Sequence, residues 1–200
     1  MKYKNLFVKS YARSASNFII YNTAQIIPSI NIHKKSWQEL NKNIHNSVTV
    51  SILRNPKDAI ISDISMSISD MQYSIDQIVK LDYQKSIDSF KEYIALLNKN
   101  INRVIPFTFE QITENSKETF KIFLQECGHH ENFNFPNAKI KQKILNNELM
   151  NKRQIFLPSS KNLEIYGTIS NYINNDIFNS VLDEYNECKL NIYKRQLDFL

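Results

Sequence analysis

Residues 48–62 of the chain read VTVSILRNPKDAIIS. The first six residues mostly alternate between apolar and polar side chains and are rich in β-branched residues, which is typical of a strand. The strand is predicted to stop at Arg54-Asn55-Pro56, and apolar residues at helical spacing follow as far as Ile68. Pro56 lies at the start of that helix, where proline is tolerated. A strand that leads through a short turn into a helix is the unit from which we infer the fold.

The same alternation continues on both sides of this unit. The pattern predicts further strands at residues 6–8, 30–33 and 103–109. It predicts further helices at 18–27, around Trp37, within 71–100, at 117–127 and at 177–197, with a less regular segment from 129 to about Gly167. Strands that alternate with helices favour a parallel sheet covered on both faces. We therefore expect an α/β fold with three layers, α/β/α, around a central, mostly parallel sheet.

The composition fits one domain with a sizeable core. The chain has 200 residues, of which 42% are hydrophobic and 12% aromatic, so disorder of the whole chain is excluded. No internal repeat or low-complexity linker marks a boundary, and we expect residues 1–200 to form a single domain. The two cysteines, Cys127 and Cys188, form neither a disulfide framework nor a zinc site, and they fit a reducing compartment.

Charge and hydropathy limit the partners. No apolar run approaches the roughly 20 residues that cross a bilayer, and the first residues lack a secretory pattern. We therefore expect a soluble, cytoplasmic protein without a membrane span. The net charge of +5 favours anionic partners in general. Because the lysines are scattered along the chain and not gathered on one element, no nucleic-acid partner is expected.

Two segments that follow strands could bind an anion, since ligands of parallel sheets lie at the carboxyl ends of strands. After the first strand, a serine-rich loop containing Arg13 leads to a helix N-terminus, which attracts phosphate or sulfate. Arg13 would add a charge-assisted pair of hydrogen bonds. Neutral donors would come from Ser14, Ser16 and Asn17. The alternative is an ordinary loop in which Ser16 or Asn17 caps the helix.

The second segment follows the strand of residues 48–53. Arg54 lies at the end of the strand and Ser62 lies two turns into the next helix, so both could reach one anion at the sheet edge. The alternative is a structural arginine that pairs with Asp58.

Together the two segments resemble the cytosolic sulfotransferase family, whose members transfer a sulfuryl group from 3'-phosphoadenosine 5'-phosphosulfate (PAPS). Residues 12–18, ARSASNF, stand where the family has Pro-Lys/Arg-Ser-Gly-Thr/Ser-Thr-Trp. Residues 54–58, RNPKD, with Ser62 match the family segment Arg-Asn-Pro/Ala-Lys/Arg-Asp and its later Ser. Residues 107–128 are similar to a family strand end, Tyr-Glu-Asp-Leu, and a helix end, Phe-Leu-Gly. After Gly128 the family's late Arg-Lys-Gly loop has no clear equivalent.

The resemblance implies a P-loop-like fold of the sulfotransferase type. It also implies an enzyme that uses PAPS, releases 3',5'-phosphoadenosine (PAP) and needs no metal. The 5'-phosphosulfate would be surrounded by Arg13, Ser14, Ala15, Ser16 and Asn17. Phe18 and Phe109 would flank the adenine, with core packing as the alternative for both. The 3'-phosphate would be bound by Arg54 and Ser62.

The general base has two candidates. The family carries Lys-Thr-His at the end of the next strand, where the His accepts the proton and the Lys holds the departing oxygen. Residues 32–36 here read IHKKS. If His33 takes the His position it is the natural base, because histidine titrates near neutrality. In the other register of the alignment with Lys-Thr-His, His33 takes the position of the family Lys and Lys35 takes that of the His. The chemistry favours His33, the later spacing of Glu39 favours the second register, and a structural surface histidine is a further alternative.

The resemblance implies a sulfotransferase acting on a hydroxyl or amine of a small-molecule, glycan or peptide acceptor. One alternative is a catalytically impaired sulfotransferase-fold protein that binds a nucleotide or a protein partner, because Ala15 replaces a glycine and Asn17 a threonine. Another is a P-loop kinase-like phosphotransferase. It is disfavoured because the chain has only two glycines and lacks Gly-Lys-Ser/Thr.

Overall fold

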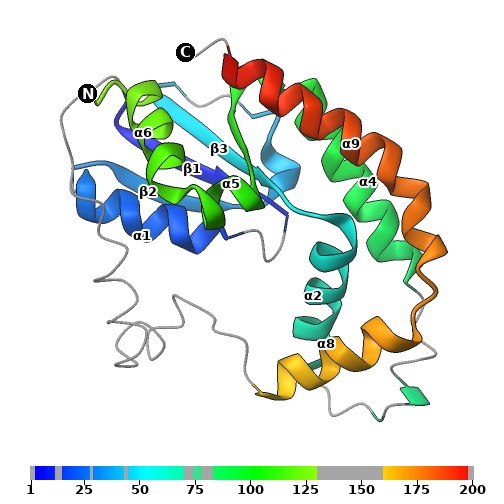
Figure 1. Cartoon of the computed structure of the whole chain (residues 1–200). Helices are drawn as coiled ribbons and strands as arrows, with labels where there is room; N and C mark the ends of the chain where they lie inside the picture. Colours follow the sequence, from blue (N-terminus) through cyan, green and yellow to red (C-terminus); the bar gives the residue numbers. More distant parts are fainter. Residues whose placement is uncertain are drawn as a thin grey trace.

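The computed structural model of the chain describes residues 3–11, 15–27, 29–42, 45–69, 74, 76–77, 83–129 and 160–197 (Figure 1). The strands are β1 (Asn5–Lys9), β2 (Asn31–Lys35), β3 (Ser47–Leu53) and β4 (Ile105–Thr108). The helices are α1 (Ser16–Ile26), α2 (Pro56–Ser69), α4 (Gln84–Lys99), α5 (Phe109–Glu114), α6 (Ser116–Glu126), α8 (Ser160–Tyr172) and α9 (Asp176–Leu197), with short 3-10 turns η1 (Trp37–Glu39) and η2 (Ile101–Arg103).

The four strands form one parallel sheet in the order β2-β1-β3-β4. Leu6 lies opposite Val48 on one side and opposite Ile32 on the other, so β1 is central. The chain crosses from β2 over β1 to reach β3. The order of the strands therefore reverses between β1 and β3, and this is where parallel sheets bind ligands.

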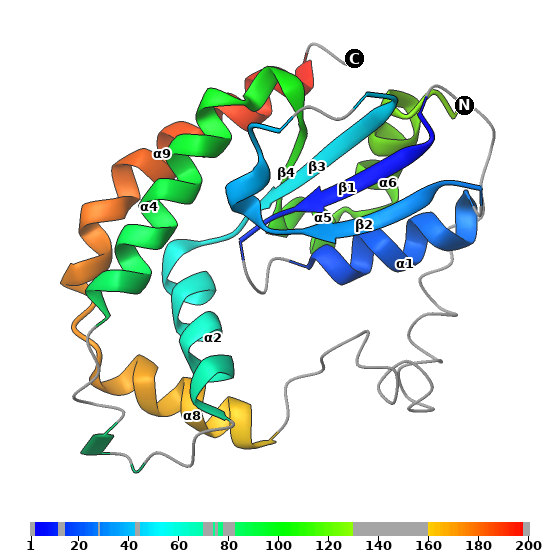
Figure 2. The ribbon, with the colours of Figure 1, turned by 180° about the vertical axis from the view of Figure 1, so that it is seen from behind.

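Helices cover both faces of the sheet, which confirms the three-layer α/β/α prediction (Figures 1 and 2). Leu6 and Val8 point to the core shared with α1, α5 and α6. The intervening residues of the strands point to the other face, where Tyr93 of α4 hydrogen-bonds to Ser51 and to the carbonyl of Ile52. Alternate strand residues are therefore buried on opposite sides, as expected for a doubly covered parallel sheet.

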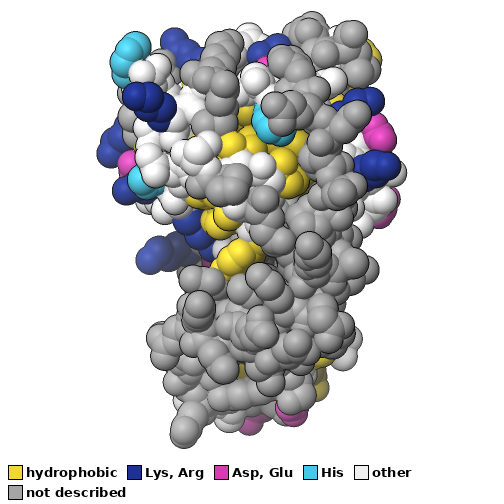
Figure 3. All heavy atoms as spheres, turned by 90° about the vertical axis from the view of Figure 1, so that its left-hand side faces the viewer, with side chains coloured by type: hydrophobic (Ala, Val, Ile, Leu, Met, Phe, Trp, Pro, Cys, Tyr) yellow, Lys and Arg dark blue, Asp and Glu magenta, His cyan; other side chains and the backbone are white. Residues whose placement is uncertain are grey.

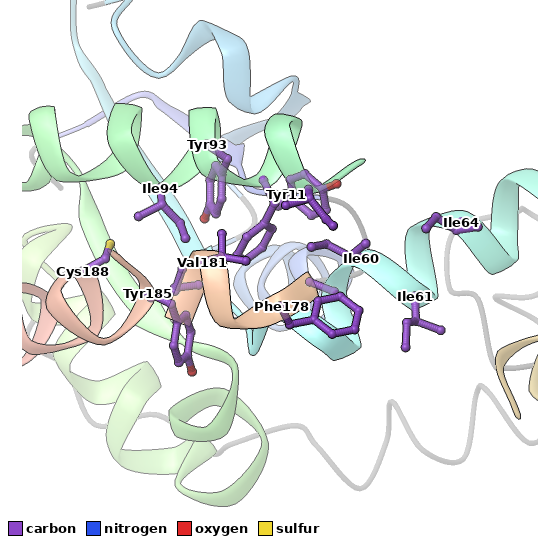
Figure 4. Packing of buried hydrophobic residues seen from close by; sticks show 14 of the residues in the cluster. Tyr11, Ile60, Ile61, Ile64, Tyr93, Ile94, Phe178, Val181, Tyr185 and Cys188 are labelled. Carbon is purple, nitrogen blue, oxygen red and sulfur yellow. The ribbon is translucent and has the colours of Figure 1, made fainter. Parts of the chain in front are cut away.

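A second core lies between α2, α4, α8 and α9, on the face of the sheet that Tyr93 contacts. Figure 4 shows Tyr11 and Tyr93 beside Val181 of α9 and Ile60 of α2. This core is continuous with the sheet because Leu53, the last residue of β3, belongs to it.

Several boundaries differ from the prediction by one or two residues, and two differences concern residues of the candidate site or its neighbours. Phe109 was expected in a strand, but it is the first residue of α5, because Thr108 and Gln111 form a capping box through their side chains and backbone N–H groups. The less regular segment predicted up to Gly167 is wrong from Ser160 onward, since α8 runs through the glycine. The buried Ile165, Ile169 and Ile173 recur every four residues and hold this helix against the core.

Helix α6 ends at a glycine, and the edge strand β4 is bound by a side chain of α9. Gly128 ends α6 at φ 74, with its N–H donated to Gln125 O and the N–H of His129 to Leu124 O, as the sequence predicts. At the edge of the sheet, the amide of Gln196 in α9 donates to the carbonyl of Pro106 in β4 at 2.8 Å.

Within the described ranges, no helix combines the length and the apolar composition that a membrane crossing requires.

Candidate functional site

The candidate site lies at the carboxyl ends of β1 and β3, which are neighbours in the sheet. The segment after β1 leads to the N-terminus of α1 at Ser16, and the segment after β3 leads to the N-terminus of α2 at Pro56. Two helix N-termini therefore follow adjacent strand ends, and both attract anions. Arg13 and Ser14, the predicted phosphosulfate ligands, lie outside the described residues.

Serine side chains extend the contact between the two strand ends. The hydroxyl of Ser51 donates to the carbonyl of Lys9 at 2.7 Å, and the N–H of Ile52 donates to the hydroxyl of Ser10 at 2.9 Å. These bonds continue beyond the last paired residues, Val8 and Val50. They hold the first residue of the loop beside β3.

Tyr11 anchors the same loop in the second core. Its ring is buried and packs edge-on against Phe90, with centroids 4.9 Å apart. Its hydroxyl lies 3.5 Å from Asp63 Oδ2 and 3.4 Å from the carbonyl of Ser86. Burial, and then the charge of Asp63, raise the pKa of Tyr11. The chain on one side of residues 12–14 is thus fixed to α2 and α4.

Ala15 fixes the chain on the other side. It stands at the N-cap of α1 with φ 58 and ψ 19, the left-handed conformation that favours glycine. Its carbonyl accepts the N–H of Phe18 at 2.9 Å. The prediction that Ser16 or Asn17 caps α1 is wrong, because both lie inside the helix and Ala15 makes no side-chain cap. Ala15 therefore has a backbone conformation that is typical of glycine.

Asn17, in the first turn of α1, is joined to β2. Its Oδ1 accepts a hydrogen bond from Nζ of Lys34 at 3.1 Å. Ser16 beside it is buried. The described part of the predicted phosphosulfate loop, residues 15–17, therefore lies against the end of β2 as well as that of β1.

Lys9, the last residue of β1, is a feature that sequence reasoning missed. Its side chain is buried, and Nζ donates to the carbonyls of Glu39 at 2.8 Å and Lys42 at 3.1 Å. Burial lowers the pKa of Lys9, although the charge of Glu39 opposes this effect. The ammonium group holds the chain after β2 against the end of β1. A lysine at a strand end is ordinarily exposed, so the local sequence carries no signal for this role.

The two candidate bases occupy different levels of β2. Lys35 is the last residue of the strand, is exposed and pairs in register with Lys9. His33 pairs with Phe7, and the two rings stack with centroids 4.8 Å apart. Nε2 of His33 lies 3.4 Å from Oδ1 of Asn5, the first residue of β1. The imidazole is thus directed toward the amino ends of the strands, whereas Lys35 lies at the carboxyl edge.

Arg54 and Phe109 meet at the carboxyl ends of β3 and β4. The guanidinium carbon of Arg54 lies 4.5 Å from the centroid of the Phe109 ring. Phe18, the other predicted neighbour of adenine, packs edge-on against Phe120 of α6 at 6.0 Å. It is partly buried against the core on that face of the sheet. The structure thus places Phe109 beside an arginine and Phe18 in core packing.

The start of α2 has a capping residue and a partner for Asp58. Oδ1 of Asn55 accepts the N–H of Asp58 at 3.4 Å, which caps the helix. Oδ1 of Asp58 accepts a hydrogen bond from the hydroxyl of Tyr166 at 2.6 Å. Ser62 is partly buried in α2. Asp58 therefore binds a phenol of α8, a contact that the sequence does not suggest because the two residues are distant in the chain.

The surface on the side of α1 and β2 carries basic groups. Figure 3 shows Lys and Arg side chains toward the margins of the upper half of this face, around a central group of hydrophobic side chains.

In the part of the chain that the structure describes, no three His, Cys, Asp or Glu side chains gather in a way that could hold a metal ion.

No protein-family model matches the chain, and no curated protein matches it significantly.

Proposed function

We propose that this protein is a PAPS-dependent sulfotransferase. The observation that carries the proposal is the left-handed Ala15 at the start of α1, one strand away from Arg54-Asn55-Pro56 at the start of α2. A helix N-terminus that begins after a left-handed residue suits a phosphosulfate, and an arginine at the neighbouring strand end suits the 3'-phosphate. Both segments follow strands at the reversal of strand order, where α/β folds bind nucleotides.

The reaction is an in-line transfer. The acceptor oxygen or nitrogen forms a bond to sulfur, while the bond from sulfur to the bridging oxygen of PAPS breaks and PAP leaves with the electron pair. The acceptor loses its proton to a base of the protein. Such transfers need positioned positive charge around the equatorial and leaving oxygens, and little covalent chemistry from the protein.

The residues of the site supply these functions. Arg13 and the N-terminus of α1, with Ser14, Ser16 and Asn17, would bind the 5'-phosphosulfate. Arg54 and Ser62 would bind the 3'-phosphate, and Phe109 supports Arg54 through the contact of its ring with the guanidinium.

The acceptor side would lie at the end of β2. Lys35 lies at the carboxyl end of β2, and the two anion-binding segments also follow carboxyl ends of strands. This position favours Lys35 over His33 as the group that acts on the acceptor or the leaving oxygen. A base must accept the proton that the acceptor loses. His33 stays a candidate because of its chemistry.

We place the protein in the cytoplasm and the acceptor among small molecules, glycans or peptides. Cys127 and Cys188 are buried and free, which suits a reducing compartment. Neither statement depends on the assignment of the base.

Calorimetric titration with PAP and with ADP tests the proposal. The two ligands carry the same number of phosphates in different positions, so their difference reports recognition of the 3'-phosphate. PAP is expected to bind more tightly than ADP. Equal binding, or none, would overturn the PAPS assignment, and tighter ADP binding would favour a kinase-like phosphotransferase.

Transfer of labelled sulfate from PAPS to a panel of metabolites, glycans and peptides tests catalysis. A labelled product supports the sulfotransferase. Selective PAP binding without transfer to any acceptor would favour the catalytically impaired, nucleotide-binding alternative.

A further inference from the structure

Helix α8 brings a phenol to the predicted 3'-phosphate side of the site. The helix packs against α2 through Ile165 and Ile169, which share a buried cluster with Ile60 and Ile64. Figures 1 and 2 both show α8 running across α2. This packing places Tyr166 within reach of the first turn of α2.

Tyr166 makes a short hydrogen bond there. Its hydroxyl donates to Oδ1 of Asp58 at 2.6 Å. Burial raises the pKa of Tyr166 to about 12, the hydrogen bond and charge of Asp58 act in the same direction, and the charge of Arg54 acts against them. The three side chains therefore act on one another electrostatically.

A carboxylate four residues after an arginine at a helix start would ordinarily attract the guanidinium. An ionised carboxylate only accepts hydrogen bonds, and each donor that it binds occupies one of the lone pairs of its oxygens. The phenol of Tyr166 is such a donor. The Arg54 guanidinium itself lies over the Phe109 ring.

We propose that Tyr166 is a positioning residue for the 3'-phosphate. By donating to Asp58, it competes with Arg54 for this carboxylate and so keeps the guanidinium oriented toward an anionic ligand. The inference rests on the proposed function, because the ligand in question is a 3'-phosphorylated adenosine nucleotide.

A double-mutant cycle on ligand binding tests this role. The proteins are wild type, Tyr166→Phe, Asp58→Asn and the double variant, each titrated with PAP and with ADP. Tyr166→Phe is expected to weaken PAP binding about fivefold, the factor that corresponds to one hydrogen bond. ADP binding is expected to change by less than about twofold.

The second arm of the cycle separates positioning from support of the fold. In the Asp58→Asn background the competing charge is absent, so adding Tyr166→Phe is expected to cause no further loss of PAP affinity. A merely structural role would weaken PAP and ADP alike and would persist in that background. Tyr172→Phe is the matched control, because Tyr172 lies on the same helix and is 63% exposed.

The outcomes distinguish the two proposals. If wild type prefers PAP to ADP but Tyr166→Phe leaves this preference unchanged, the role of Tyr166 is overturned and the sulfotransferase assignment stands. If wild type shows no preference for PAP, the assignment fails and the inference fails with it.

Discussion

The guanidinium carbon of Arg54 lies 4.5 Å from the centroid of the Phe109 ring. The two residues follow β3 and β4, which are neighbours in the sheet, so their meeting is set by the pairing of those strands. An aromatic face attracts a cation, so the Phe109 ring helps to hold the guanidinium at the carboxyl end of β3, where a phosphate could bind it. This contact links the packing of the fold to the proposed recognition of PAP.

Replacing Arg54 by alanine should therefore weaken PAP selectively. We expect a loss of about 10- to 100-fold in PAP affinity, as for one charge-assisted contact, measured by calorimetric titration. ADP affinity should change little. Arg103→Ala is the control, because Arg103 is an exposed arginine of η2 on another part of the chain. Unchanged PAP binding by Arg54→Ala would remove this residue from the site.

The left-handed conformation of Ala15 predicts opposite effects of one substitution at two positions of the chain. Ala15→Gly relieves a backbone cost of about 1–2 kcal/mol and adds unfolded-chain entropy of about 0.5–1 kcal/mol, so the free energy of unfolding should rise by about 0.5 kcal/mol. Ala24→Gly, at an exposed position inside α1, should lower it by about 1 kcal/mol. Urea unfolding followed by circular dichroism measures both. A decrease for Ala15→Gly as large as that for Ala24→Gly would contradict the left-handed conformation.

The different levels of Lys35 and His33 on β2 predict different kinetic effects. Once an acceptor is known, Lys35→Ala should lower the rate of sulfate transfer about 100-fold, as for loss of a group that acts in proton transfer. His33→Ala should keep most of that rate, because its ring stacks on Phe7 and faces Asn5. The reverse result would assign the base to His33.

Tyr93 should contribute to stability through its hydroxyl. The group is fully buried, donates to the carbonyl of Ile52 at 2.7 Å and lies 3.1 Å from the hydroxyl of Ser51. Tyr93→Phe leaves those two groups without this partner, so the free energy of unfolding should fall by about 1–3 kcal/mol. Urea unfolding at neutral pH gives the value, and Tyr172→Phe, an exposed tyrosine, should have almost no effect.

Stability should fall at alkaline pH because several phenols are buried. Burial raises the pKa of Tyr93, Tyr11 and Tyr185 above the ordinary value of 10.0. The unfolded chain loses these protons near pH 10 while the folded chain keeps them, so their stabilising contribution is complete below pH 10 and is lost as the pH rises above it. Urea midpoints measured across this range should show the decline, and it should be smaller in Tyr93→Phe. A midpoint that stays constant would contradict the burial of these phenols.

Local sequence determined most of the elements. The alternation of residues 48–53, the spacing of apolar residues in α2 and the glycine after α6 act over a few residues, and β3, α2 and the end of α6 lie where these signals place them. The parallel sheet also follows from sequence, because strands separated by helices pair in parallel. The signals for α8 and for the capping box at Thr108 were present in the chain, in Ile165, Ile169 and Ile173 and in the Thr108 and Gln111 pair.

Only the tertiary structure decided the surroundings of the site residues. Lys9 is buried because the chain after β2 returns over it, and His33 is directed away from the carboxyl edge because its ring stacks on Phe7. The contact of Tyr166 with Asp58 depends on α8 packing against α2 across a long stretch of chain. Such contacts arise when separate elements bury their apolar faces together, and no short segment of sequence contains the information that brings them into place.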